Sequence, residues 1–206
     1  MKKDDITTEE KIINASIELF SEKGFDSTKT SEIAKNAGIA EGTIFRYFKT
    51  KKDILMSIVT KAIQFFSEKF VVLPLNKILH TEKPEEEILF DLLKDRYEMI
   101  TKNFSIIKVI GTEALTKEKI RERLVEHVAI KTLEIGEEFY QKGVEKGIFR
   151  GLSPRTVVRS LFGSIMMLIA EQQFLPDDKK SKDVDKEIRM IVEIFMNGIK
   201  SSRKEQ

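Results

Sequence analysis

Cysteine is absent from this chain of 206 residues, and proline and glycine are scarce, at four and ten residues. Without cysteine the chain has no disulfide, no thiolate metal ligand and no cysteine nucleophile. Few breakers together with 41% hydrophobic residues favour long helices around a buried core, and they argue against a low-complexity chain. The composition therefore predicts a folded, helical protein.

The chain also lacks the motifs of common enzyme classes. Its only histidines, His80 and His127, are far apart in the sequence. There is no HExxH motif, no glycine-rich phosphate loop and no nucleophile motif. We therefore predict that the protein is not an enzyme, and that it has no catalytic residue, no metal site and no cofactor.

Long hydrophobic runs are missing as well. The longest apolar-rich stretch, from Ser160 to Ala170, is too short to span a bilayer. The first residues, MKKDDITTEEK, place acids directly after two lysines and contain no apolar run, unlike a signal peptide. These features predict a cytoplasmic protein with no membrane partner.

The overall charge does not indicate a nucleic-acid partner, because 36 basic and 34 acidic residues leave a net charge of only +2. The local distribution is more informative. Arg46, Lys49, Lys51 and Lys52 form a cluster of cations with no acid between them. This cluster predicts a small basic surface at one place in the chain.

The spacing of apolar residues predicts helices throughout. The first runs over about 7–23, with Thr7 or Thr8 as N-cap and Gly24 as its end. Two short helices follow at 30–37 and 41–48, separated by the turn Gly38-Ile39-Ala40. Longer helices are expected near 51–69, 85–102, 105–116, 118–146, 154–174 and 183–201. The change in helix length near Asp53 predicts two domains, residues 1–52 and 53–206, with one helix running across the boundary.

The two short helices have the residues that a helix-turn-helix needs at its crossing, where small and apolar side chains must pack. The inner face of the first helix is formed by Ile33, Ala34 and Ala37. The inner face of the second is expected to be Ile44 with Tyr47 or Phe48. This packing would leave the outer face of the second helix free for the major groove of DNA.

The stretch FDSTKTSEIAKNAGIAEGTIFRYFKTKKDIL, from Phe25 to Leu55, resembles the N-terminal domain of the TetR family of repressors. The shared features are a short helix led by Thr, an Ala-Gly turn, a Gly-Thr pair, the run Phe-Arg-Tyr-Phe and Lys-Thr-Lys. The resemblance implies an all-α fold, with an N-terminal three-helix helix-turn-helix domain joined to a larger C-terminal helical ligand-binding and dimerisation domain.

The function that the resemblance implies is sequence-specific transcription regulation. The protein would act as a homodimeric repressor on a palindromic operator in double-stranded DNA, and an apolar small-molecule effector of unknown identity would release it. The helix that begins near Lys51 would swing when the effector binds. The alternative is a helical interaction protein that has lost DNA binding.

Residue by residue, the resemblance implies that Thr43, Tyr47 and Lys51 contact phosphate, where hydroxyls, a phenol and helix N-terminal amides can all bond. Arg46 would add counterion release. Base edges would be read from Ala40, Glu41, Gly42 and Phe45, and Thr30 is included among the DNA-binding residues. Two alternatives stay open: Glu41 as an acid favoured only by the helix dipole, and Phe45 as cover for the core.

The end of the chain resembles the last helices of TetR-type regulators more loosely, through residues 143–150, Ser153-Pro154 and residues 192–199. In that family the last two helices form a four-helix bundle between two subunits. Apolar residues wrap more than one face of the helix at 154–174, and Gly163 and Ser164 would permit close approach. The expected dimer interface consists of Val158, Phe162, Ile165, Met166, Ile169, Ile191 and Phe195.

The middle of the chain is the expected ligand-binding region. Apolar cavities that take small molecules are lined by aromatic side chains with a few polar groups. Aromatic residues at helical spacing are also ordinary core residues, so this prediction carries an alternative. The candidate ligand-binding residues are Phe65, Phe66, Arg96, Tyr97, Phe104 and His127.

Overall fold

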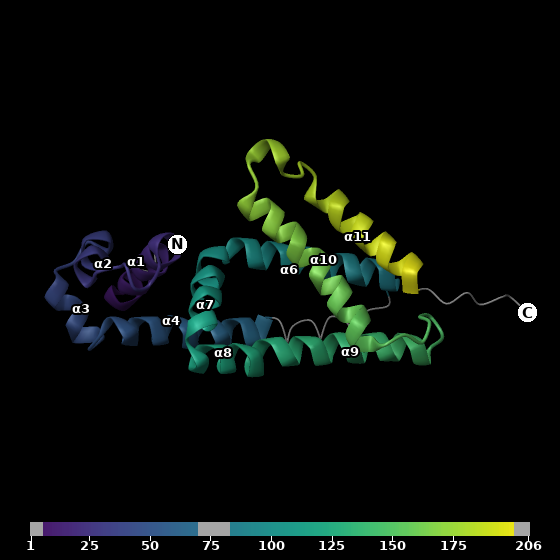
Figure 1. The fold of residues 1–206 in the computed structure, drawn as a ribbon, viewed down its shortest axis with the longest axis horizontal. Coiled ribbons are helices and arrows are strands. Elements are labelled where there is room, and N and C mark those ends of the chain that lie inside the picture. Colours follow the sequence, from purple (N-terminus) through teal and green to yellow (C-terminus); the bar gives the residue numbers. More distant parts are fainter. Residues whose placement is uncertain (1–5, 70–82, 200–206) are drawn as a thin grey trace, which may run out of the picture. The chain divides into compact units, whose positions relative to one another are not determined.

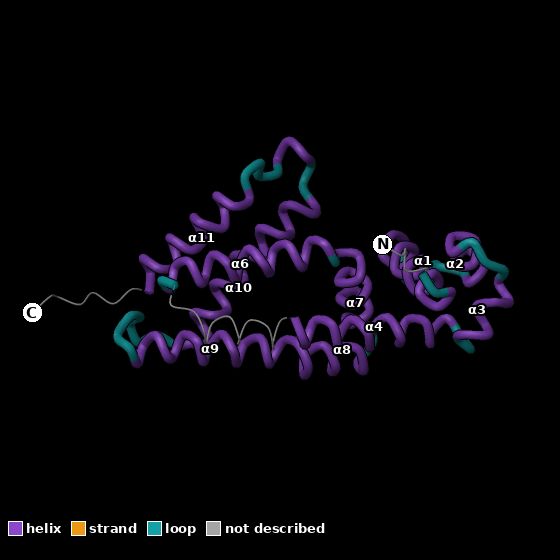
Figure 2. The backbone as a smooth tube through the Cα atoms, turned by 180° about the vertical axis from the view of Figure 1, so that it is seen from behind, coloured by secondary structure: helices purple, strands orange, loops and turns teal. Residues whose placement is uncertain are grey.

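The computed structural model describes residues 6–69 and 83–199, and within these ranges the chain is helical with no β-strand (Figures 1 and 2). This confirms the all-α prediction. The α-helices are α1 Thr8–Lys23, α2 Thr30–Ala37, α3 Glu41–Tyr47, α4 Lys51–Ser67, α6 Glu85–Lys102, α7 Phe104–Thr116, α8 Glu118–Leu124, α9 Ile130–Glu145, α10 Pro154–Phe174 and α11 Val184–Ile199.

Every predicted helix has a counterpart, and the one clear difference is in the predicted helix at 118–146. There the structure has α8, then a π-helical segment at Val125–Ala129, then α9. A π turn closes its hydrogen bonds over five residues instead of four, so it widens the helix by one residue. The apolar spacing on either side does not reveal such a local insertion. Residues 200 and 201 of the last predicted helix lie outside the described residues.

The start of α1 follows from a capping box. The Thr7 hydroxyl accepts a hydrogen bond of 3.2 Å from the Glu10 amide, and the Glu10 carboxylate accepts one of 2.9 Å from the Thr7 amide. These bonds from Thr7 lower the pKa of Glu10. At the other end Gly24, with φ of +86°, ends the helix as predicted.

The start of α10 is fixed by a proline. Pro154 is the first helical residue, which agrees with the predicted start at 154, and Ser153 precedes it as the N-cap residue. The Ser153 side chain makes no capping bond to a backbone amide. Its hydroxyl instead accepts a bond of 3.3 Å from the side chain of Thr156. The proline, with its fixed φ, therefore sets this helix start.

The helices form two compact units. The first comprises Met1–Phe66 and Asn103–Val125, so it holds α1 to α4 with α7 and α8; the second comprises Ser67–Lys102 and Glu126–Gln206. The chain passes from one unit to the other between residues 66 and 67, 102 and 103, and 125 and 126. The predicted division at residue 52 concerned roles in DNA and ligand binding, and in that sense it stays a prediction.

The core of the first unit is built from aliphatic side chains on four helices. Ile12 of α1, Ile33 of α2, Ile44 of α3 and Ile54 of α4 are all fully buried. Helix α7 packs against α1 in this unit, and α8 packs against α7. The helix-turn-helix is therefore one part of a larger packed body.

The core of the second unit lies where α10 packs against α6, α9 and α11. Its buried side chains include Leu89 of α6, Tyr140 of α9, Ile165 and Ile169 of α10, and Ile188 of α11. None of the described helices is long and apolar enough to cross a bilayer.

Gly143 is required where the chain folds back after α9. The ring of Phe149 stacks on that of Tyr140, with centroids 5.3 Å apart and planes 6° from parallel. The Tyr140 hydroxyl donates a 2.6 Å hydrogen bond to the carbonyl of Arg150. A Cβ atom at Gly143 would lie 2.2 Å from the Phe149 ring. Because Phe149 is buried, its ring has no open space to move into.

We expect Gly143→Ala to lower the free energy of unfolding by about 1–3 kcal/mol, because the added methyl overpacks a filled site. The measurement is the urea midpoint of the variant against that of the wild type. Gly111→Ala in α7 is the matched control, since a Cβ there meets nothing within 4 Å. This control should gain about 0.5–1 kcal/mol from helix propensity. Equal midpoints for the two variants would contradict the prediction.

Candidate functional site

Helices α2 and α3 form a helix-turn-helix. The turn depends on Gly38, whose φ of +67° and ψ of 36° lie in the left-handed region. Its amide and that of Ile39 bond back to carbonyls of α2, with Ile39 N 3.0 Å from the Ala34 oxygen. At the crossing, Ile33, Ala34 and Ile44 are buried. The predicted helix-turn-helix is thus present, and of its expected inner residues only Ala37 is half-buried and not buried.

The sequence left open whether Tyr47 or Phe48 faces the core, and the structure answers this. Phe48 is 8% exposed and Tyr47 is 48% exposed. Phe48 follows the last residue of α3 and its amide bonds to the Ile44 carbonyl at 2.9 Å. Tyr47 is therefore an outward phenol at the end of α3, which suits the predicted phosphate contact.

The outer face of α3 is open to solvent. Phe45 is 50% exposed, so the alternative that it covers the core does not describe its position. Thr43 is half-buried. The remaining predicted residues of this face are exposed, namely Ala40, Glu41, Gly42 and Arg46. We call the exposed residues 40–42 and 45–47 the α3 face. It combines an apolar ring, a carboxylate, a phenol and a cation over two turns, the mixture that base edges and phosphates can both engage.

A hydrogen bond joins the first residues of α2 and α3. The Thr30 hydroxyl donates to Glu41 Oε1 at 2.6 Å. Glu41 lies in the first turn of α3, where the helix dipole favours an acid. The bond fixes one carboxylate oxygen, so Glu41 is oriented as well as exposed. Both interpretations of Glu41, base contact and dipole acid, are compatible with this position.

Helix α4 begins beside the α3 face. The Thr50 amide donates to the Asp53 carboxylate at 2.9 Å, and the Asp53 amide donates to the Thr50 hydroxyl at 3.2 Å. This reciprocal pair fixes the first turn of α4.

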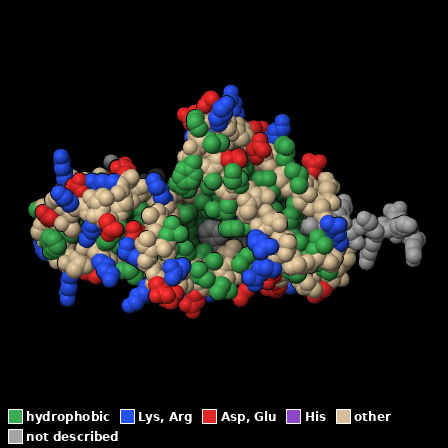
Figure 3. All heavy atoms as spheres, in the orientation of Figure 1, with side chains coloured by type: hydrophobic (Ala, Val, Ile, Leu, Met, Phe, Trp, Pro, Cys, Tyr) green, Lys and Arg blue, Asp and Glu red, His purple; other side chains and the backbone are tan. Residues whose placement is uncertain are grey.

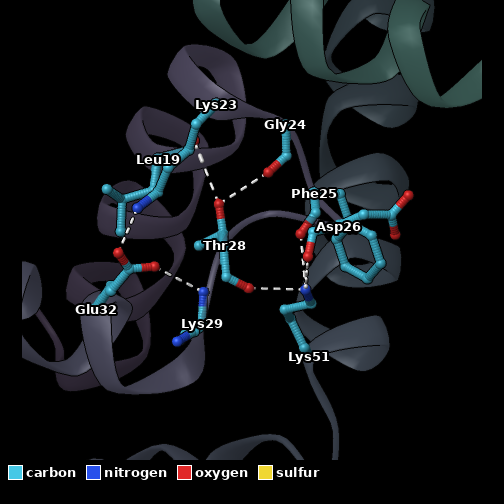
Figure 4. A network of polar contacts seen from close by, with 9 residues as sticks. All are labelled: Leu19, Lys23, Gly24, Phe25, Asp26, Thr28, Lys29, Glu32 and Lys51. Carbon is cyan, nitrogen blue, oxygen red and sulfur yellow. Dashed lines mark hydrogen bonds and ion pairs between the residues drawn. The ribbon is translucent and has the colours of Figure 1, made fainter.

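Lys51 follows Thr50, and its ammonium points back toward the loop between α1 and α2 (Figure 4). It bonds the carbonyls of Phe25 and Thr28, each at 2.7 Å, and that of Asp26 at 3.3 Å. The predicted contact of this side chain with phosphate stays a prediction.

A cavity of about 110 Å³ lies in the second unit. It is enclosed mainly by apolar side chains of α6, α9 and α10, with Phe195 from α11. The lining residues are Leu89, Leu92, Leu93, Arg96, Thr132, Ile135, Gly136, Phe139, Tyr140, Val157, Val158, Leu161, Phe162, Ile165 and Phe195. Such a site can hold an apolar group, and it lies in the part of the chain where a ligand was expected.

Of the predicted ligand-binding residues, only Arg96 lines this cavity. Phe65 and Phe66 pack edge to face in the first unit, and Phe104 belongs to α7 of that unit. Tyr97 is half-buried on α6, and His127 is half-buried in the π-helical segment. These five positions do not line the cavity, because their helices direct them elsewhere. His80 lies outside the described residues.

Arg96 is the charged group of the cavity lining. Its Nη1 atom donates to the Lys69 carbonyl at 2.8 Å, and its Nη2 atom lies 2.7 Å from the Asp95 carboxylate. Burial lowers the pKa of Arg96, and the neighbouring Asp95 acts in the opposite direction. A guanidinium held this way in an apolar surround favours an acidic group over a neutral one.

The predicted dimer residues lie in three kinds of position. Ile165 and Ile169 are each 1% exposed and belong to the core of the second unit. Val158, Phe162 and Phe195 line the cavity, as Ile165 also does, and Met166 and Ile191 are half-buried. The role of these residues in a dimer stays a prediction.

Other apolar side chains of α10 and α11 are open to solvent. Met167 is 60% and Ile194 is 72% exposed, and Figure 3 shows hydrophobic side chains at the surface of this part of the molecule. Met167 also lines a groove between the two helices. Its lining residues are Ser160, Gly163, Ser164, Met167, Leu168, Glu171, Glu187 and Ile191. Met167 and Ile194 are not among the predicted interface residues, and an interface on these two helices stays a prediction.

Among the described residues, no group of three or more His, Asp or Glu side chains is placed to hold a metal ion. The features that can act on another molecule are therefore the α3 face, the cavity and the groove.

Residues 12–58 match the sequence model of the family described as "Bacterial regulatory proteins, tetR family". The chain is 25% identical over 189 residues to the "Fatty acid metabolism regulator protein" of Bacillus subtilis, covering 91% of this chain and 93% of that protein.

The chain is also similar to solved structures of transcriptional regulators. The transcriptional regulator FadR from Bacillus subtilis, in complex with stearoyl-CoA, is 26% identical with a TM-score of 0.67, covering 92% of this chain and 98% of that one. The fatty acid degradation regulator FadR from Bacillus halodurans is 24% identical with a TM-score of 0.69, covering 96% and 98%. The second likeness is one of fold.

Proposed function

Since the chain belongs to the TetR family of transcriptional regulators, we propose that it represses transcription from a palindromic operator and is released by a long-chain acyl ligand. The observation that carries the DNA-binding role is the α3 face, presented by a complete helix-turn-helix within the region that matches the family. The relatives named above are regulators, and none supports the alternative of an interaction protein without DNA binding.

On DNA, we assign the phosphate contacts to Thr43 and Tyr47, and base readout to Glu41 and Phe45. A carboxylate can accept from the amine of cytosine, and a ring can press on the methyl group of thymine. Arg46 is exposed and adds counterion release. The exposure of Glu41, Phe45 and Tyr47 supports the assignment, while Thr43 is half-buried.

The ligand class follows from the cavity and from the relatives. Apolar walls suit an acyl chain, and Arg96 suits an acidic head group. The Bacillus subtilis regulator in complex with stearoyl-CoA is similar over nearly the whole chain. However, the cavity of about 110 Å³ is below the roughly 300–1,000 Å³ of small-molecule sites. A long acyl chain must therefore widen it.

Widening the cavity gives the ligand a way to act on DNA binding. A ligand shifts an equilibrium only toward a state that it binds better, and here that state has the wider cavity. Helix α6 lines the cavity, and its last residue, Lys102, is followed by the first unit. We infer that widening the cavity moves α6, and that this movement reaches the first unit through the chain between residues 102 and 103.

The homodimer is proposed to form through the exposed apolar side chains of α10 and α11. Gly163 and Ser164 give a partner helix room to approach, since a Cβ at Gly163 would meet nothing within 4 Å. A two-fold dimer would place two α3 faces on successive major grooves, about 34–36 Å apart.

For DNA binding, we expect the protein to bind the DNA upstream of its own gene with an affinity that falls steeply as salt rises. Tyr47→Phe should weaken binding by about 0.5–1.5 kcal/mol on all sequences alike, because it removes only a phosphate contact. The measurement is fluorescence anisotropy with operator and unrelated duplexes at several salt concentrations. Tyr97→Phe on α6 is the control and should leave affinity unchanged. Unaltered binding by Tyr47→Phe would remove Tyr47 from the interface.

For the ligand, we expect stearoyl-CoA to release the protein from operator DNA. Leu161→Trp should retain DNA binding and lose this response, because an indole fills a cavity of about 110 Å³. Leu152→Trp is the control, since Leu152 is 40% exposed and not among the lining residues. The measurement is DNA release as stearoyl-CoA is titrated. A normal response from Leu161→Trp would place the ligand elsewhere.

For the dimer, Ile194→Glu and Gly163→Glu should each give a monomer, because a carboxylate would be buried without a partner. Sedimentation velocity over a range of concentrations measures the state. Leu115→Glu serves as the control, as Leu115 is an 81% exposed residue of α7 outside the proposed interface. If both variants remain dimeric, the interface lies on other helices.

A further inference from the structure

The ammonium group of Lys51 lies among three backbone carbonyls (Figure 4). It bonds the oxygens of Phe25 and Thr28 at 2.7 Å and that of Asp26 at 3.3 Å. An ammonium has three N–H donors and no acceptor, so three carbonyl oxygens match its full capacity. The Lys51 side chain is half-buried, whereas its neighbours Lys49 and Lys52 are exposed. Lys51 is therefore distinct from the other cations of the basic cluster.

The aromatic ring of Phe25 adds a second contact to the same ammonium. The Nζ atom of Lys51 lies 4.4 Å from the ring centroid. The Nζ atom of Lys117, after α7, lies 4.9 Å from the same centroid, and Lys117 also pairs with the buried Glu113. Each such contact between a cation and the face of an aromatic ring is favourable. The ring thus joins the starts of α4 and α8 to the loop between α1 and α2.

The loop that supplies the carbonyls, residues 24–29, is itself ordered by internal bonds. Thr28 is 1% exposed, and its hydroxyl donates to the Gly24 carbonyl at 2.9 Å. The Thr28 amide donates to the Phe25 carbonyl at 3.2 Å. These bonds turn three carbonyls toward one point. Without a cation there, their negative ends would face one another with no donor between them.

We propose that Lys51 is a positioning residue for DNA binding, which locks the start of α4 onto the loop between α1 and α2 without touching phosphate. The proposal rests on the proposed DNA-binding function. The recognition helix α3 lies in the sequence between the two ends that Lys51 joins, residues 25–28 and residue 51. Closing this segment fixes where α3 lies relative to α4. Because the Lys51 ammonium is bound to carbonyls of the protein, it does not neutralise a phosphate and releases no counterion from DNA.

This role has a consequence for regulation. If α4 were free to swing about its first turn, the three carbonyl bonds of Lys51 would have to break. With the bonds intact, α4 and the helix-turn-helix move together. A ligand signal that reaches α4 therefore displaces the whole helix-turn-helix rather than changing the angle between α3 and α4.

The test compares Lys51→Met with Arg46→Met, each of which removes one cation. Affinity for operator DNA is measured against salt at a temperature well below unfolding, where both variants are fully folded. For Lys51→Met we expect affinity to fall about tenfold with the salt slope unchanged, and loop amides to exchange about tenfold faster. For Arg46→Met the salt slope should fall by about 0.9 for each subunit, about 1.8 for the dimer, with loop exchange unchanged.

Two results would overturn the proposal. One is a salt slope that falls by about 0.9 for each subunit, about 1.8 for the dimer, in Lys51→Met while loop exchange stays as in the wild type, since this is the signature of a phosphate contact. The other is wild-type affinity in the folded Lys51→Met protein, which would leave Lys51 a role in stability alone. Loss of DNA binding by the wild type itself would instead refute the proposed function.

A second variant keeps the test decisive if Lys51→Met does not fold. Phe25→Leu retains the Lys51 charge and removes the ring that both cations contact. Positioning by Lys51 predicts weaker binding, an unchanged salt slope and faster loop exchange in this variant. A direct phosphate contact by Lys51 predicts wild-type affinity, because the ammonium would still reach the DNA. Wild-type affinity in Phe25→Leu would therefore contradict positioning.

Discussion

The seven residues of α3 must be held in place by packing, because a helix of two turns is not stable alone in water. Ile44 on its inner face, which is fully buried, and Phe48 at its end supply that packing. Gly38 brings α2 across it through a backbone conformation that other residues rarely adopt. When the inner side of α3 is packed in this way, the residues on the opposite side of the helix point to solvent. Recognition of DNA therefore depends on a buried isoleucine as much as on any exposed side chain.

The helix-turn-helix was predictable from the sequence because its determinants are local. The spacing of Ile33, Ala34 and Ile44 around Gly38 lies within a dozen residues, and the structure has α2 and α3 within one residue of the expected limits. The orientation of the Lys51 ammonium was not predictable. It depends on carbonyls more than twenty positions away in the sequence. A lysine in a basic cluster is instead expected to be a solvent-exposed charge.

The cavity was the least predictable feature, since it is formed by residues from four helices that are distant in the sequence. Gly136 illustrates the reason: a Cβ there would lie 2.7 Å from a methyl group of Val158, so α9 and α10 approach closely at this point. The residues around Gly136 in the sequence do not predict that it packs against Val158. The surroundings of the apolar residues of α10 were also not predictable, because an apolar pattern around the whole helix is consistent with core, cavity or partner contacts. Ile165 is buried and lines the cavity, whereas Met167 is exposed and lines the groove.

The two units also constrain how a ligand can act. A small cavity in the second unit and a helix-turn-helix in the first are joined by three passages of the chain. One passage lies at the start of the π-helical segment Val125–Ala129, where the wider turn interrupts what the sequence predicts as one continuous helix. The passage between residues 66 and 67 lies in the last turn of α4, and the passage between residues 102 and 103 follows α6. Helix α6 on one side and α9 on the other both line the cavity. Under the proposed function, a ligand that widens the cavity would act on α6, and the first unit would respond as one body whose internal angles Lys51 holds fixed.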